Sequence, residues 1–315
     1  MTLLAFLGVI LFGGVNSIGV RQTVLELAPF WGAALRFLGA GLLLAALVLV
    51  ARRPWPRGRS FSGAMLYGAV GFAGSFGFVY PALRHMPAST AQVLIALTPL
   101  FTFAFAIAHR QERFRLQGLI GALIAFVGVG VVFLDQLKAD VPAASLVLTL
   151  LGAACIAESG VIVKWIPRSD PLATNAVAML TGGAILMALS LVTGEAMVLP
   201  TLRSTWLAIG YLIVFGSVVM FGLYLFALRR WTASAVSYTT LLLPFITVSV
   251  ATALTGERVT PSLIAGGAVV LIGVYIGSFL RIRSSRSSAS SLPECLPVDA
   301  CPEVAVAATV LPART

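Results

Sequence analysis

Charged residues are scarce in this chain. Only 10% of its 315 residues are Asp, Glu, Lys or Arg, whereas such residues make up about a quarter of an ordinary soluble domain. Hydrophobic residues make up 59%, and the mean hydropathy is +1.01. This balance excludes a soluble globular domain and indicates an integral membrane protein.

Residues that carry catalysis or bind metals are also few. The chain has three cysteines and two histidines, and it has no HExxH pattern, nucleophile elbow or phosphate-cradling loop. His85 and His109 are expected in loops, far from any acidic pair, and Cys295 and Cys301 have no histidine partners. The sequence therefore predicts a protein that is not an enzyme and has no metal site and no cofactor.

The positive net charge does not indicate nucleic acid. The charge of +10 comes from arginines in short loops, without a basic face interleaved with aromatic residues. The expected partners are therefore the lipid bilayer and a small-molecule substrate, with no nucleic acid. A homodimer is left open.

Apolar runs long enough to span a bilayer recur along the chain. A spanning helix needs about 20 mostly apolar residues. We predict an all-α membrane protein with ten such helices, at residues 2–20, 29–50, 62–81, 87–108, 116–134, 144–165, 172–194, 205–228, 232–254 and 260–280. The tail 281–315 is rich in Arg, Ser and Pro and is expected to be disordered.

The distribution of Lys and Arg predicts the orientation. If the amino terminus is cytoplasmic, only five of them lie outside: Arg21, Arg84, Lys138, Arg203 and Arg258. Fifteen lie inside: Arg52, Arg53, Arg57, Arg59, Arg110, Arg113, Arg115, Lys164, Arg168, Arg229, Arg230, Arg281, Arg283, Arg286 and Arg314. Because positive charge is retained on the cytoplasmic side, both termini are expected in the cytoplasm, with the chain in the inner membrane of the cell.

A stretch of the chain occurs twice. Residues 71–131 align with residues 216–276 at a constant offset of 145 and without a gap. The matches include turn and punctuation residues: Ala88-Ser89 falls on Ala233-Ser234, Pro99 on Pro244, and Glu112-Arg113 on Glu257-Arg258. Because five spans separate the copies, the two must lie in opposite orientations in the membrane. We therefore divide the chain into a first repeat (1–134), a second repeat (144–280) and a cytoplasmic tail (281–315).

The repeated pattern resembles a known family. Residues 86–134 and 232–279 each have a small-residue helix start, a proline within the helix, a Glu-Arg pair at the loop and a glycine-punctuated helix. This pattern is similar to the EamA-type repeat of the drug/metabolite transporter superfamily, and Arg36 after Pro29 also resembles it. The resemblance implies a ten-helix bundle with cytoplasmic termini that exports small metabolites.

The two repeated prolines are candidate elements of a translocation pathway. Pro99 and Pro244 each leave a backbone carbonyl without its helical donor, which lipid cannot satisfy. Polar residues lie nearby, namely Gln92 and Thr98 in the first repeat and Tyr238 and Thr240 in the second. We expect these residues to line a wet cavity. The alternative is a packing kink in which Ser and Thr bond back to the helix.

Four further residues are candidates for the pathway. Arg36 and Glu158 are charged residues within predicted spans, and such residues often mark substrate or proton pathways. The alternatives are snorkelling of Arg36 toward the headgroups and a hydrated position of Glu158 at the inner rim. Asn16 could bind substrate or another helix, and Ser75, beside a glycine stripe that favours helix packing, could reach the cavity.

These features predict a secondary transporter that works by alternating access. The expected activity is export of small amphipathic metabolites such as amino acids. A nucleotide-sugar or organic-phosphate exchanger is the alternative within transport, and a membrane-embedded enzyme or scaffold is the alternative outside it.

The predicted topology can be tested with fusion reporters. A reporter placed at Arg57 or after Arg286 is expected to be cytoplasmic, and one placed at Lys138 is expected to be external, because the arginine-rich loops stay inside. Reporter activity in intact cells measures each location. An external carboxy terminus would mean an odd number of spans and would contradict the inverted repeat.

Overall fold

The computed structural model describes residues 2–111, 114, 116–138, 141–167, 169–231, 236, 239–255 and 260–279. Within this part of the chain the regular secondary structure is helical, which confirms the predicted all-α fold class. Seven helical segments are long and apolar enough to cross a membrane, and three apolar helices are shorter. The tail predicted to be disordered lies outside the described residues.

The helical segments follow the predicted spans. The first repeat contains α1 (Thr2–Gly14) and α2 (Asn16–Val24), then α3 (Pro29–Val50), then α4 (Arg59–Gly68), η1 (Ala69–Gly74) and α5 (Ser75–Arg84), then α6 (Ala88–Ile95) and α7 (Thr98–Ala108), and α8 (Leu116–Lys138). The second repeat contains α9 (Ala143–Trp165), α10 (Pro171–Val192), α11 (Arg203–Ile213), η2 (Val214–Val219) and α12 (Met220–Leu228), α14 (Thr239–Thr255) and α15 (Pro261–Phe279).

Proline and short polar residues set the starts of several helices. Pro29, Pro171 and Pro261 each begin a helix, where the missing N–H of proline costs no hydrogen bond. The carboxylate of Asp170 caps α10 by accepting hydrogen bonds from the backbone N–H groups of Leu172 (3.0 Å) and Ala173 (3.2 Å). The starts of these helices can therefore be read directly from the sequence.

Two segments of π-helix, η1 and η2, interrupt equivalent long helices. Residues 69–74 and 214–219 are related by the same offset of 145 that relates the repeated sequences. A π-helix turn contains an extra residue, which shifts the side chains that follow it and is frequent at functional sites. The two copies therefore share a local distortion of the backbone as well as a sequence pattern.

Equivalent helices of the two repeats pack directly on each other. α3 lies along α10, and the contact is reciprocal. A Cβ on Gly41 would lie 2.8 Å from Leu180 Cγ, and a Cβ on Gly183 would lie 2.9 Å from Leu38 Cγ. The absence of side chains at these glycines lets the two helices approach closely, which stabilises helix pairs in lipid.

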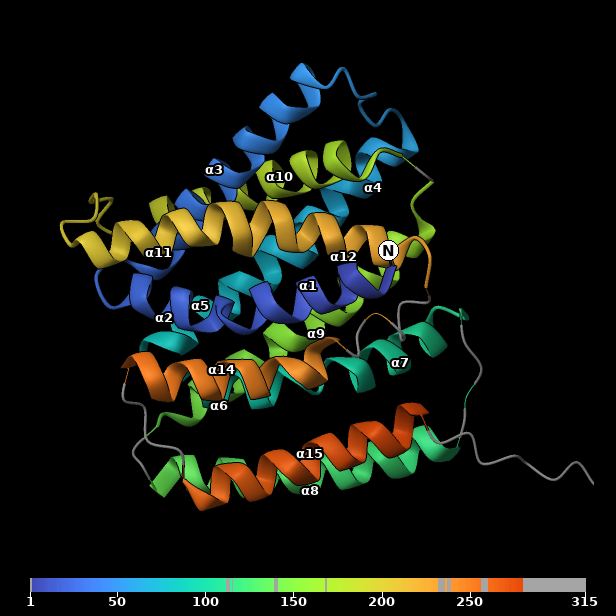
Figure 1. The fold of residues 1–315 in the computed structure, drawn as a ribbon, viewed down its shortest axis with the longest axis vertical. Coiled ribbons are helices and arrows are strands. Elements are labelled where there is room, and N and C mark those ends of the chain that lie inside the picture. The colour runs from blue at the N-terminus through green and yellow to red at the C-terminus, as the bar shows by residue number, and fades with distance from the viewer. Residues whose placement is uncertain are drawn as a thin grey trace, which may run out of the picture. The chain divides into compact units, whose positions relative to one another are not determined.

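The helices α8 and α15 approach each other even more closely than α3 and α10 do. A Cβ on Gly121 would lie 2.4 Å from the carbonyl oxygen of Gly273, and a Cβ on Gly128 would lie 2.7 Å from that of Gly266. Backbone therefore faces backbone along this pair. Figure 1 shows α8 and α15 side by side at one edge of the bundle.

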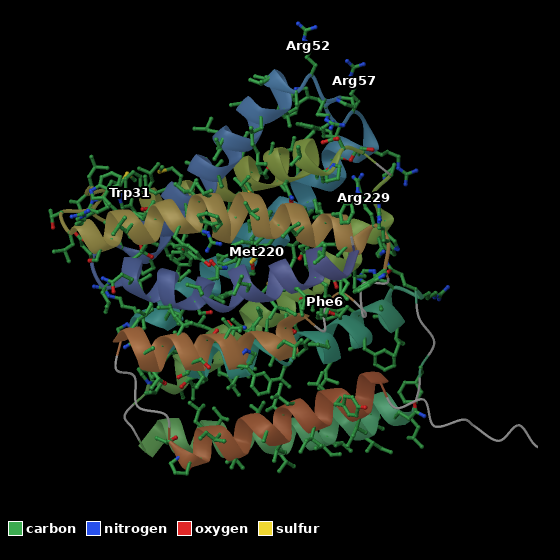
Figure 2. All side chains as sticks on the ribbon, in the orientation of Figure 1. Phe6, Trp31, Arg52, Arg57, Met220 and Arg229 are labelled. Carbon is green, nitrogen blue, oxygen red and sulfur yellow. The ribbon has the colours of Figure 1, made fainter. Side chains whose placement is uncertain are left out.

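The two repeats run in opposite directions through the bundle. Figure 1 shows the segment from α4 to α5 running opposite to the segment from α11 to α12, although the two are equivalent in sequence. Trp31 and Arg229 lie at opposite ends of the long helices (Figure 2). This is the arrangement expected of an inverted repeat.

Polar contacts join neighbouring helices at both ends of the bundle. At the end that carries Trp31, the Glu195 carboxylate accepts hydrogen bonds from the backbone N–H groups of Phe30 (3.2 Å) and Trp31 (2.8 Å). A carboxylate at the start of α3 also interacts favourably with the helix dipole. At the other end, the Nζ of Lys164 donates a hydrogen bond to the carbonyl oxygen of Trp231 (2.6 Å).

The glycine contact predicts a specific loss of stability. Gly121→Leu is expected to lower the free energy of unfolding by about 3 kcal/mol, because the new side chain would collide with the backbone of α15. Thermal unfolding of the purified protein in detergent measures this, and the midpoint should fall by roughly 5–10 °C.

Gly130, on the same helix, provides the matched control. A Cβ at Gly130 has no atom within 4 Å, so Gly130→Leu should leave the midpoint nearly unchanged. Equal effects of the two substitutions would show that α8 and α15 do not pack as described.

Candidate functional site

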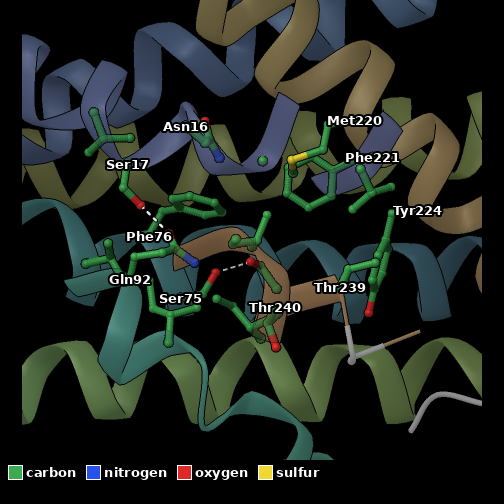
Figure 3. A pocket seen from close by; sticks show the side chains of 18 of the residues that line it. Asn16, Ser17, Ser75, Phe76, Gln92, Met220, Phe221, Tyr224, Thr239 and Thr240 are labelled. Carbon is green, nitrogen blue, oxygen red and sulfur yellow. Dashed lines mark hydrogen bonds between the residues drawn. The ribbon is translucent and has the colours of Figure 1, made fainter. Parts of the chain in front are cut away.

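A cavity of about 110 Å³ lies between the two repeats. Residues of α1, α2, α4, α5 and α6 line it from the first repeat, and residues of α9, α12 and α14 line it from the second. Figure 3 shows Asn16, Phe76, Gln92, Phe221 and Thr240 around it. The cavity therefore lies at the interface where an inverted-repeat transporter is expected to bind its substrate.

Equivalent positions of the two repeats meet in the wall of this cavity. Four pairs at the offset of 145 line it: Ser75 and Met220, Phe76 and Phe221, Val79 and Tyr224, and Ile95 and Thr240. The rings of Phe76 and Phe221 lie edge to face, with centroids 6.4 Å apart. The positions are symmetric, but most of the side chains differ in chemistry.

The π-helices place these side chains. Ser75 and Phe76 follow directly after η1, and Met220 and Phe221 follow directly after η2. The Ser75 hydroxyl donates a hydrogen bond to the carbonyl oxygen of Gly71, inside η1. The extra residue in each helix thus coincides with the point at which the helix meets the cavity.

The polar atoms of the cavity are few and partly unpaired. The Ser17 hydroxyl donates a hydrogen bond to Gln92 Oε1 at 2.7 Å. Gln92 Nε2, Asn16 Oδ1 and the Tyr67 hydroxyl are buried without a hydrogen-bond partner among the described residues. Because buried polar groups normally have partners, these atoms are available to a bound solute.

Among the described residues, none of the side chains that line the cavity is charged. Most of it is apolar, with Phe76, Phe221, Met220 and Leu243 facing the few polar groups. Such a cavity fits a small solute that has an apolar part and a few hydrogen-bonding groups.

The structure brings four of the predicted pathway residues together. Asn16, Ser75, Gln92 and Thr240 line the cavity. Arg36 lies behind Phe76, fully buried, so its side chain does not snorkel to the surface. Tyr238 lies outside the described residues.

The two prolines do not line this cavity. Pro99 is buried at the start of α7, and Pro244 borders a separate apolar cavity of about 300 Å³ between α14 and α15. The helix that contains the proline is interrupted only in the first repeat, between α6 and α7. There the Thr98 hydroxyl donates a hydrogen bond to the carbonyl oxygen of Ile95 (2.6 Å). The equivalent of Thr98 is Leu243, which has no hydroxyl group, and α14 continues through Pro244. This bonding matches the packing alternative at Pro99.

Glu158 lies apart from the cavity, paired with a histidine. Its Oε1 is 2.7 Å from His109 Nε2, and the two side chains are 24% and 30% exposed. His109, which was expected in a loop far from any acidic pair, therefore lies against a single carboxylate. The two residues are 49 positions apart in the chain, and only the packing of α7 on α9 brings them together.

Several lining residues were missed from the sequence. They include Ser17, Tyr67, Phe76, Phe221 and Tyr224. The repeat offset was a usable signal for the phenylalanine pair, because Phe76 and Phe221 are identical at equivalent positions beside Ser75. Ser17 and Tyr67 lie outside the aligned stretch, so the repeat does not mark them.

The fold and the cavity define a helical membrane protein with a solute-sized site between two inverted halves. The model of the EamA-like transporter family matches residues 1–134 and 143–279. The chain therefore belongs to the EamA-like transporter family and is a membrane transporter.

Curated relatives have transporter names. An "uncharacterized inner membrane transporter YedA" of Escherichia coli is 29% identical over 266 residues, which cover 83% of this chain and 86% of that protein. A "probable amino-acid metabolite efflux pump" of Salmonella typhimurium is 26% identical over 289 residues, which cover 87% and 94%.

A solved crystal structure has the same fold. It superposes with a TM-score of 0.65 at 20% sequence identity, and the match covers 90% of this chain and 98% of that chain.

Proposed function

We propose that this protein is a secondary transporter that exports small amphipathic metabolites, such as amino acids, by alternating access. The observation that carries the proposal is the cavity lined by equivalent positions of two inverted repeats. Two nearly equivalent halves can tilt against each other and open one central site to either side of the membrane.

The lining supports an amphipathic substrate. Apolar residues dominate, and the three unpaired polar atoms of Asn16, Tyr67 and Gln92 can hydrogen-bond a small head group. A nucleotide-sugar or organic-phosphate exchanger would need several cations for its phosphate groups, and none of the described lining residues is charged. The relative named as a probable amino-acid metabolite efflux pump agrees with an amino-acid substrate and with export.

A membrane-embedded enzyme or scaffold is less well supported. The family and the curated relatives have transporter names. Among the described residues, the acid–base pair His109 and Glu158 lies outside the cavity lining. Catalysis on a solute bound in the cavity would require such groups to face that solute.

We place the protein in the inner membrane with both termini in the cytoplasm. This orientation rests on the fifteen cationic residues predicted inside and the five predicted outside. The partners are a small-molecule substrate and the surrounding lipid, and a homodimer stays open.

We assign the coupling of transport to protons to Glu158. It is a carboxylate within a spanning helix, where charged residues often mark ion pathways, and its Oε1 lies 2.7 Å from His109 Nε2. Their contact joins the end of α7 in the first repeat to α9 in the second, so a change in protonation would act on the contact between the repeats.

Counterflow of labelled metabolites into proteoliposomes tests the proposal. Small amphipathic solutes, including amino acids, are expected to accumulate, and Tyr67→Phe is expected to raise KM about threefold or more by removing an unpaired hydroxyl from the cavity. Tyr275→Phe, on an exposed face of α15, is the matched control and should leave KM unchanged. No counterflow of any solute in the panel would contradict the proposal.

The same vesicles test the coupling when a pH gradient is imposed. Glu158→Gln is expected to abolish the response to the gradient while counterflow continues. A parental response to the gradient in Glu158→Gln would place Glu158 at a hydrated rim and favour uniport.

A further inference from the structure

Arg36 is the one charged side chain that is buried among the described residues, and it is also the largest side chain that is fully buried there. It lies seven residues into α3, which corresponds to about 10 Å of helix rise from Pro29. A cation at this depth is strongly unfavourable unless an anion or water compensates it.

The partners of Arg36 among the described residues are all neutral. Nε donates to the Ser217 hydroxyl at 2.9 Å, and Nη2 donates to the carbonyl oxygen of Gly216 at 2.8 Å. The guanidinium carbon lies 4.7 Å from the ring centre of Phe37 and 4.9 Å from that of Phe76. In the described part of the chain no carboxylate pairs with Arg36; the neutral Tyr80 hydroxyl interacts with the guanidinium, and Nη1 makes no hydrogen bond of regular geometry.

These contacts do not explain why the residue is charged. The two hydrogen bonds hold η2 in place, and a neutral donor such as glutamine could make bonds of that kind. The cation–π contacts offset only part of the cost of removing a full charge from water. The positive charge, which no described carboxylate balances, and the Nη1 that makes no regular hydrogen bond both favour a bound anion.

The guanidinium lies next to the cavity. Phe76, which lines the cavity, covers it on one side, and Asn16, which also lines the cavity, lies beside it. A Cβ on Gly216 would be 2.8 Å from Asn16 Oδ1 and 3.6 Å from Arg36 Nη2. Asn16 Oδ1 is buried without a partner, so an unpaired acceptor and a cation with an unpaired donor lie close to each other.

We propose that Arg36 and Asn16 form the head-group subsite for an α-amino acid. Nη1 of Arg36 binds the carboxylate, past the edge of Phe76, and Oδ1 of Asn16 accepts a hydrogen bond from the ammonium group. The apolar side chain of the solute lies against Phe221 and Met220. This inference rests on the proposed transport function and specifies its substrate as a zwitterion, because a cation and an unpaired acceptor lie beside the same residue, Gly216.

Three probes of the same shape separate the two contacts. Valine carries both groups, valinamide lacks the carboxylate, and isovalerate lacks the ammonium group. Counterflow and solute-induced thermal stabilisation of the purified protein are measured for each probe. The parent protein should prefer valine to either analogue by at least tenfold, because an unmatched buried polar group penalises the wrong solute.

The variants should lose one contact each. Arg36→Gln keeps a donor for η2 and is expected to raise KM for valine at least tenfold with no change for valinamide. Asn16→Ala should raise KM for valine and valinamide but not for isovalerate. Arg36→Lys should keep the preference for valine over valinamide, and Arg84→Gln, which removes an exposed charge, should behave as the parent.

Two results would overturn the subsite. If Arg36→Gln raises KM for valine and for valinamide equally, Arg36 only positions η2. If the parent transports other amphipathic solutes but shows no preference for valine over its analogues, the proposed transport function stands and the subsite does not. Absence of counterflow for every solute would reject the transport function itself.

Discussion

Close contact between equivalent helices of the two repeats is the constraint on which the rest of the structure depends. Lipid tails are as apolar as the side chains, so moving an apolar side chain from lipid to a helix interface gains little free energy. Helix pairs therefore depend on direct van der Waals contact. The reciprocal contacts of Gly41 with Leu180 and of Gly183 with Leu38 provide it for α3 and α10, and glycine backbones provide it for α8 and α15. The two inverted copies are thereby joined along the interface between them.

The cavity follows from the same arrangement. Because equivalent helices pair across the interface, the residues after η1 and η2 face one another, and Phe76 meets Phe221. The two π-helices are nevertheless held differently. A Cβ on Gly68, just before η1, would collide with the backbone of Ala178 in α10, whereas η2 is held by the Arg36 side chain of α3. The symmetric fold thus contains an asymmetric contact beside the cavity.

Much of the fold could be predicted from the sequence, because long apolar runs, helix-starting prolines and a gapless repeat are local or periodic signals. Four residues of the cavity lining were also within reach, since Asn16, Ser75, Gln92 and Thr240 are polar residues in apolar helices. The remainder depends on contacts between distant segments. The bonds of Arg36 to Gly216 and Ser217 cross about 180 positions, and no local pattern predicts them.

The prolines show the limit of arguing from a repeat. Pro99 and Pro244 are equivalent in sequence, but the neighbouring Thr98 and Leu243 differ, and with them the path of the helix. The spacing of an internal repeat therefore predicts the position of a proline better than the effect of that proline on the backbone.

Accessibility of one cavity position from both sides tests alternating access most directly. Thr240→Cys, with Cys155, Cys295 and Cys301 replaced by Ser, is labelled with an impermeant maleimide in right-side-out and inside-out vesicles. The account predicts that the thiol reacts from either side and that a transported solute slows both reactions. Labelling from one side only, unaffected by solute, would contradict a cavity that opens alternately.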